Sequence, residues 1–255
     1  MNTQEPNRPE APTGEPATHE VVYTPPASKP VVVYTLIVVT VLAFLLQLAT
    51  QYLFSTKFDL LFALGGKVNE LILRGQFWRL ITPVFLHGSF LHIAFNMYAL
   101  FSIGPSLEKH YGHNRFLILY FLAGFAGNVF SFLFTKNASL GASTAVFGLV
   151  AAEVVFIYRN RFLFGERSSR ILTNLGLIIV VNLVLGLSPG IDNWGHLGGL
   201  LGGFAFAWFA GPLLGVEINL GRYLLTDRRL HRDVLWAAVV LLMGFSLLVA
   251  LKFIL

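Results

Sequence analysis

The sequence predicts an all-α fold, a polytopic bundle of membrane helices, and three observations favour it. Of the 255 residues, 55% are hydrophobic and only 12% are charged, whereas soluble chains carry roughly 25% charged residues. The mean hydropathy is +0.69. The hydrophobic residues gather in long uncharged blocks close to the roughly twenty residues that cross a bilayer. A water-soluble globular protein is therefore excluded.

Residues 1–30 differ from the rest of the chain. They hold seven of the eleven prolines and four glutamates, with almost no aliphatic residues. Such a segment cannot bury enough apolar surface to fold, so we expect a disordered tail. It also lacks the charged region and short apolar run of a cleavable signal peptide. The first hydrophobic block should therefore stay in the protein as a membrane anchor.

Seven stretches are long and apolar enough to be read as membrane spans. The fourth is short and is interrupted by Glu153. The last forms a seventh helix within residues 234–255. The seven stretches are Val31–Tyr52, Phe85–Leu107, Phe116–Thr135, Ser143–Tyr158, Ile171–Leu187, Trp194–Val216 and Val234–Leu251.

The positive charges between the spans predict an orientation. Ten Arg and Lys residues follow spans two, four and six, and five follow spans one, three and five. The positive-inside rule then places the amino terminus and a basic loop, residues 217–233, in the cytoplasm and the carboxyl terminus outside. We expect a bacterial plasma membrane. The basic residues stand singly or in small groups, so the net charge of +5 does not indicate a nucleic-acid partner.

The loop over residues 53–84 is too apolar for a solvated linker. It contains Phe77 and Trp78 beside Arg79. An interfacial, partly helical segment in the outer headgroup layer would suit this composition, because indole side chains prefer that depth. A small folded outer loop without lipid contact is the alternative.

Polar residues inside spans are costly in hydrocarbon and usually face a cavity or a partner. In the second span, His92 and Asn96 are four residues apart and share one helix face, and His87 precedes them by about a turn and a half. Ser143, in the segment Gly141-Ala142-Ser143, opens the fourth span. One face of the second span is therefore polar and rich in hydrogen-bond donors.

The sixth span opens with His196, which lies on one stripe with Gly199 and Gly203. Glycines let two helices approach closely, so His196 could reach Ser143 if spans four and six pack together. A serine hydroxyl becomes a nucleophile when an imidazole accepts its proton. The predicted orientation puts these residues at one depth, near the outer ends of their helices. The pattern indicates a serine hydrolase site below the membrane surface.

Each signal also has a structural interpretation. A serine at a helix start is usually a cap, and spaced glycines usually mean packing alone. The histidines of the second span could indicate haem or metal, but the sequence has no HExxH motif. The chain has no cysteine, which removes disulfides, thiolate catalysis and thiolate metal sites. We expect no metal and no cofactor.

Taken together, these residues resemble the rhomboid family of intramembrane serine proteases, from span one to span six. The resemblance implies a six-helix core over residues 31–216 plus the seventh helix, and a Ser143–His196 dyad whose oxyanion is bound by His92, Asn96 and the Ser143 main-chain amide. It also implies cleavage within transmembrane segments of membrane-protein substrates. The matching residues are Trp78, Arg79, His87, His92, Asn96, Glu108, Gly141, Ser143, His196, Gly199 and Gly203.

Two positions depart from the family pattern. Thr144 stands where glycine is commoner, and we expect its branched side chain to narrow the substrate pocket. Phe147 replaces a frequent tyrosine, and its ring can still pack on His196. One other class stays open: a catalytically silent rhomboid-like protein that binds client transmembrane helices, which would be expected to lack Ser143 or His196. A small-solute transporter would need an inverted repeat and broken helices at mid-membrane, which the sequence does not show. The natural substrate and the oligomeric state are not predicted.

Overall fold

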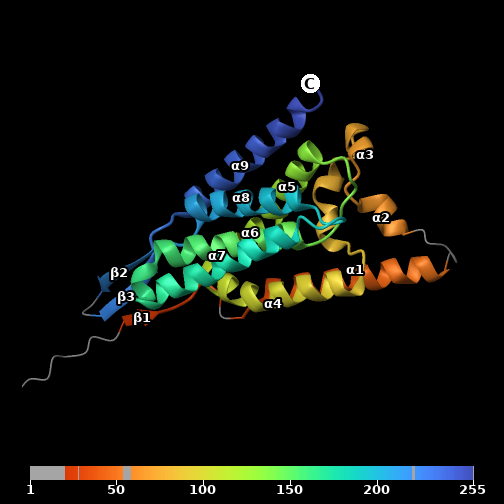
Figure 1. Ribbon diagram of the computed structural model, residues 1–255. Coiled ribbons are helices and arrows are strands. Elements are labelled where there is room, and N and C mark those ends of the chain that lie inside the picture. Colours follow the sequence, from red (N-terminus) through yellow and green to blue (C-terminus); the bar gives the residue numbers. More distant parts are fainter. Residues whose placement is uncertain (1–20, 28, 54–58, 220–221, 255) are drawn as a thin grey trace, which may run out of the picture.

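The computed structural model describes residues 21–27, 29–53, 59–219 and 222–254. Seven long helices make up most of it (Figure 1). Each corresponds to one of the predicted spans, which confirms the helical bundle. They are α1 (Val31–Leu53), α4 (Phe90–Tyr111), α5 (His113–Phe134), α6 (Ser143–Arg159), α7 (Arg167–Leu185), α8 (Asn193–Ala210) and α9 (His231–Leu251).

Five of these helices, α1, α4, α5, α7 and α9, are long and apolar enough to cross a membrane by length and composition. The other two are different in character. Helix α6 has 17 residues, and α8 has 18 residues, five of them glycine. Both are largely buried against other helices. The two helices that carry Ser143 and His196 are therefore interior helices of the bundle.

Glycines on two sides of α8 explain its position between α5 and α6. A Cβ atom at Gly199 or Gly203 would collide with the main chain of α6, and one at Gly198 or Gly202 would collide with α5. Small residues are needed where helix backbones approach this closely. The first of these two stripes is the one that the sequence predicts.

The first loop is partly helical, as expected. It contains α2 (Leu60–Gly65), α3 (Asn69–Leu73) and the 3₁₀ turns η1 (Phe77–Leu80) and η2 (Thr82–Phe85); residues 54–58 lie outside the described part. Several large apolar side chains of this loop are exposed, as an interfacial location requires, and that location stays a prediction. They are Leu64, Leu73, Phe77, Trp78 and Ile81.

A small sheet lies at the other end of the bundle from α2 and α3 (Figure 1). Strand β1 (Val21–Tyr23) pairs in parallel with β3 (Arg222–Asp227), and β2 (Leu214–Asn219) pairs with β3 in antiparallel. The expected disordered tail therefore does not hold for Val21–Tyr23, because β3 offers those residues a partner; residues 1–20 lie outside the described part.

The sixth span is shorter than predicted. Helix α8 ends at Ala210, and the chain enters β2 at Leu214. Gly211 caps the helix with its amide on the Ala207 carbonyl, and Pro212 follows, which cannot continue a helix. The expectation that the helix reaches Val216 is therefore wrong, and part of the predicted basic loop 217–233 is a hairpin.

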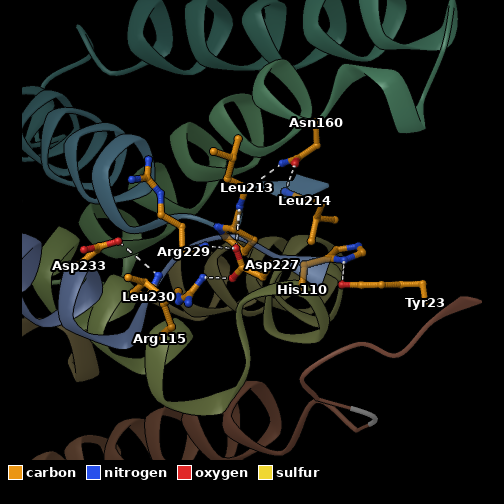
Figure 2. Close-up of polar contacts among 11 residues, drawn as sticks. Tyr23, His110, Arg115, Asn160, Leu213, Leu214, Asp227, Arg229, Leu230 and Asp233 are labelled. Atoms are coloured by element: carbon orange, nitrogen blue, oxygen red, sulfur yellow. Dashed lines mark hydrogen bonds and ion pairs between the residues drawn. The ribbon is translucent and has the colours of Figure 1, made fainter. Parts of the chain in front are cut away.

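Asp227 joins this hairpin to the bundle (Figure 2). Its Oδ2 accepts a hydrogen bond from Arg115 at 2.8 Å, and its Oδ1 accepts the main-chain amides of Leu213 and Arg229, each at 3.0 Å. Nearby, the amide of Leu214 donates to Asn160 Oδ1 at 2.7 Å. The sheet end is thus held by an ion pair and by side chains that bond to main-chain amides.

Candidate active site

Ser143 and His196 meet where the first turns of α6 and α8 lie together. The Ser143 Oγ and His196 Nε2 atoms are 2.9 Å apart, although 53 residues separate them in the chain. This distance allows the hydroxyl to donate to the imidazole. The glycines of α8 that face α6 bring the two helix backbones near enough for this contact. The structure therefore brings together the two residues predicted to form the dyad.

The imidazole of His196 is held mainly by packing. Phe147, one turn after Ser143, stacks on it with ring centroids 4.2 Å apart and an interplanar angle of 13°. This confirms that a phenyl ring at position 147 packs on His196. The Nδ1 atom of His196 is buried and has no hydrogen-bond partner among the described residues. Within that part of the chain, no carboxylate orients the ring directly.

Gly141 brings His92 close to the nucleophile. Its φ is +133°, a conformation that favours glycine. A Cβ at this position would lie 2.8 Å from His92 Nε2 and 3.6 Å from Ser143 Oγ. A side chain would therefore push His92 away, and only glycine leaves room for the imidazole beside Ser143.

His87 supports the segment that precedes Ser143. The amide of Ala142 donates to His87 Nε2 at 3.4 Å, and His87 itself is almost fully buried. Gln47 of α1 holds the main chain of His87 by accepting from its amide at 3.0 Å and donating to its carbonyl at 3.3 Å. The ring of His87 also meets that of His92 edge-on, with centroids 5.0 Å apart.

Asn96 is buried on α4, with its amide group turned back onto its own helix. Its Nδ2 donates to the His92 carbonyl at 2.9 Å. A primary amide has two N–H donors, so one N–H remains for another acceptor.

The side chain of Thr144 packs into the bundle between two neighbouring helices. Its side chain is 5% exposed and packs between α5 and α8, where a Cβ at Gly127 would come 2.5 Å from Thr144 Cβ and one at Gly195 3.2 Å from Thr144 Cγ2. The effect of Thr144 on a substrate pocket stays a prediction. Threonine fits here because glycines of both neighbouring helices make room for it.

Arg79 and Trp78 of the first loop bind main-chain oxygens. The buried guanidinium of Arg79 donates to the carbonyls of Ala63 and Gly66 and to the side chain of Gln76. The indole of Trp78 donates to the Leu64 carbonyl at 2.9 Å. Both residues hold the turns of this loop together rather than contacting the Ser143–His196 pair.

Lys67, in the same loop, is not among the residues that the sequence motifs predict. It is fully buried, and its Nζ donates to the carbonyls of Asn137 at 2.9 Å and Thr135 at 3.3 Å. Burial lowers the pKa of Lys67 to about 8, while the nearby carboxylates of Asp192 and Glu70 oppose this lowering. Lysine in a loop is ordinarily solvated, so its type gives no signal of this burial.

Two further acids lie away from the Ser143–His196 pair. Glu108, near the end of α4, accepts the amides of Val32 at 2.9 Å and Val33 at 2.8 Å, and also contacts His113. It therefore caps the start of α1. Glu153 lies deep in α6, with Oε2 buried and without a partner among the described residues. No group of three or more candidate metal ligands lies together in the described part of the chain.

The fold and site define a class: a multi-span helical membrane protein with a serine and a histidine in contact at the ends of two interior helices. Comparison with known proteins agrees with this class. A family model, the rhomboid domain, matches residues 74–213. The chain belongs to the rhomboid family, and it is an integral multi-pass membrane protein.

Three relatives illustrate the similarity. Rhomboid protease GluP of Bacillus subtilis (strain 168) is 42% identical over 189 residues, which cover 74% of this chain and 36% of that protein. RHOMBOID-like protein 9, chloroplastic, of Arabidopsis thaliana is 35% identical over 151 residues, 59% of this chain and 35% of that protein. Rhomboid-like protease 1 of Toxoplasma gondii is 33% identical over 201 residues, 69% of this chain and 68% of that protein. The chain thus spans only about a third of the length of the first two relatives.

Proposed function

We propose that this protein is an intramembrane serine endopeptidase that cleaves transmembrane segments of membrane-protein substrates. The observation that carries the proposal is the 2.9 Å separation of Ser143 Oγ and His196 Nε2 at a site built by interior helices. Membership of the rhomboid family supports it, and two of the relatives above bear the word protease in their names.

In this proposal His196 acts as the base. Its Nε2 takes the proton of Ser143 while Oγ attacks the scissile carbonyl, and the carbonyl oxygen becomes an oxyanion. The protonated imidazole then donates to the leaving amine, and water hydrolyses the acyl-enzyme by the same route in reverse. The stacked ring of Phe147 keeps the imidazole in place through both proton transfers.

The oxyanion is assigned to three donors. The first is the main-chain amide of Ser143, and the second is the imidazole of His92, which packs against Gly141 two residues before Ser143. The remaining N–H of Asn96 is the third. Donors of this kind act in the transition state, so His92→Ala and Asn96→Ala should lower kcat, by about 10- to 1000-fold per donor. A change confined to KM would contradict the assignment.

A substrate helix bonds its own carbonyls, so the segment to be cut must unwind. Substrates should therefore carry helix-weakening glycine or proline near the cut. We place the site at the outer face of a bacterial plasma membrane, with the amino terminus in the cytoplasm and residues 53–84 at the outer interface, because this orientation follows from the basic loops.

The test is cleavage of a generic single-span substrate by purified protein, with Ser143→Ala and His196→Ala as variants. Each variant should abolish cleavage while its melting temperature stays within a few degrees of the parent's. Cleavage by Ser143→Ala at the parent rate would refute the nucleophile. A folded parent that binds the substrate helix without cutting it would instead favour the silent, helix-binding alternative.

A further inference from the structure

Asp192 lies just before α8, one turn ahead of His196, and both of its carboxylate oxygens are engaged. Its Oδ1 accepts the amide of Gly195 at 3.0 Å and so caps the helix. Its Oδ2 accepts a hydrogen bond from the hydroxyl of Ser131, on α5. The main-chain carbonyl of Asp192 also accepts the amide of His196 at 3.1 Å. The first turn of α8 is therefore fixed to α5 through one side chain.

The same contact reaches the segment that leads to Ser143. The hydroxyl of Ser131 lies 3.3 Å from that of Ser139. Ser139 in turn pairs with Lys67 through two main-chain hydrogen bonds, of 2.9 and 3.0 Å. Asp192 and Ser131 thus connect the start of α8, which carries His196, to the segment around Ser139 that leads to Ser143.

The imidazole of His196 itself has few restraints, although glycine contacts with α5 and α6 and the stack of Trp194 on Phe134 hold the helix around it. Its Nδ1 has no partner among the described residues, and the stack with Phe147 restrains the ring mainly in the direction perpendicular to its plane. Sliding of the first turn of α8 would change the distance from Nε2 to Ser143 Oγ. The hydrogen bond that Ser131 donates to Asp192 adds a polar anchor on α5 to these packing contacts, and the bond from Asn193 Nδ2 to the Leu183 carbonyl at 3.1 Å adds one on α7.

We propose that Asp192 is a positioning residue that fixes His196 relative to Ser143 by capping α8 and bonding to Ser131. It acts through the helix, since among the described residues its carboxylate bonds to Gly195 and Ser131 and His196 Nδ1 has no hydrogen-bond partner. The proposal rests on the Ser143–His196 mechanism proposed above. Because a shift of about 1 Å in a reacting group can reduce a rate about 100-fold, loss of this anchor should appear in kcat.

Three substitutions distinguish the hydrogen bonds of Asp192 from its negative charge. Asp192→Ala and Ser131→Ala each remove the hydrogen bond between these two side chains. Both should lower kcat and keep KM within about twofold of the parent's. For Asp192→Ala we expect kcat to fall about 10- to 100-fold. Asp192→Asn should keep kcat within about threefold, because an amide oxygen can still cap Gly195 and its N–H can donate to Ser131. Asp233→Ala removes another carboxylate that bonds to a main-chain amide at a helix start, that of Leu230 before α9. It is the matched control and should keep the parent kcat.

Hydrogen exchange supplies a readout that does not depend on activity. The amides of Gly195 and His196 should exchange faster in Asp192→Ala and Ser131→Ala than in the parent or in Asp192→Asn. Parent-like kcat and exchange in Ser131→Ala, or equal losses in Asp192→Asn and Asp192→Ala, would overturn the proposal. A parent without activity, or an active Ser143→Ala variant, would refute the dyad instead. The exchange rates would still show whether Asp192 and Ser131 hold the first turn of α8.

Discussion

Helices α7 and α8 both pack against α6, and they do so in different ways. Helix α8 buries ten of its 18 residues, and its glycines admit the main chains of α5 and α6. Helix α7 has 19 residues and buries only Leu175. Most of the large aliphatic side chains of α7 lie on the outer surface of the bundle, where lipid can solvate them.

This difference shows how a site can be fixed inside a membrane. Lipid tails solvate apolar side chains as well as a neighbouring helix does, so helices associate through close packing and polar contacts. Helix α8 has both, and it carries His196. Helix α7 has neither to the same extent. The Ser143–His196 contact is therefore held in place by the packing of α8 against α6, and not by α7.

The largest effect should come from disrupting the close contact between α6 and the glycines of α8 that face it, Gly199 and Gly203. Gly199→Leu inserts a side chain where even a Cβ meets the main chain of Thr144, so we expect activity to fall more than about 100-fold, with loss of folded protein. Gly176→Leu on α7 is the matched control, because nothing lies within 4 Å of an added Cβ there. It should change activity less than about twofold. Gel filtration and cleavage assays measure both, and similar results for the two variants would contradict the comparison.

A second prediction concerns the contacts that hold α1, another helix with much exposed surface. Its first amides, those of Val32 and Val33, are bound by the buried carboxylate of Glu108. Glu108→Gln removes the charge from these bonds, and we expect it to lower the free energy of unfolding by about 1.5–3 kcal/mol.

The matched control for this effect is Glu166→Gln at the start of α7, since Glu166 makes no side-chain cap there. It should leave the thermal unfolding curve unchanged within about 0.5 kcal/mol. If Glu108→Gln unfolds at the parent temperature, the first helix is held by its apolar contacts alone.

The third prediction concerns the dependence of stability on pH. Lys67 has an ordinary pKa of 10.5, lowered to about 8 by burial. Between these values the unfolded chain binds the extra proton, so this residue makes stability rise with pH, by at most about 1.4 kcal/mol per unit. Below about pH 8 the full penalty for the buried charge is present. The rise from pH 8 to 10 should disappear in Lys67→Met and persist in Lys136→Met, whose lysine is exposed; identical pH profiles for parent and Lys67→Met would refute it.

Hydropathy and spacing predicted much of this molecule from the sequence. The seven spans are each a helix, because an uncharged block of bilayer length has few alternatives. Ser143, His196 and Phe147 could be placed together because glycine spacing indicates which helices approach closely. Hydropathy predicts a start for the second span at Phe85, five residues before α4 begins. Hydropathy does not show that Thr82–Phe85 forms a 3₁₀ turn or that Ser89 caps the helix at Phe90.

The contacts that the sequence did not predict join distant segments through ordinary loop residues. Asp192 and Lys67 are charged residues outside the spans, which are solvated in most proteins, and only the folded chain shows what they bind. Strand β1 is three residues long and has no partner nearby in sequence. Its pairing with β3 depends on where the bundle brings the two chain segments.

That pairing sets an order of events during synthesis. Val21 pairs with Tyr223, about 200 residues later in the chain, and a ribosome adds roughly 5–20 residues per second. Strand β1 is therefore made some 10–40 s before its partner exists. In that interval α1 and α4 to α8 are all synthesised. The sheet can close only when the whole bundle down to α8 has emerged, so it is among the last parts of the protein to assemble.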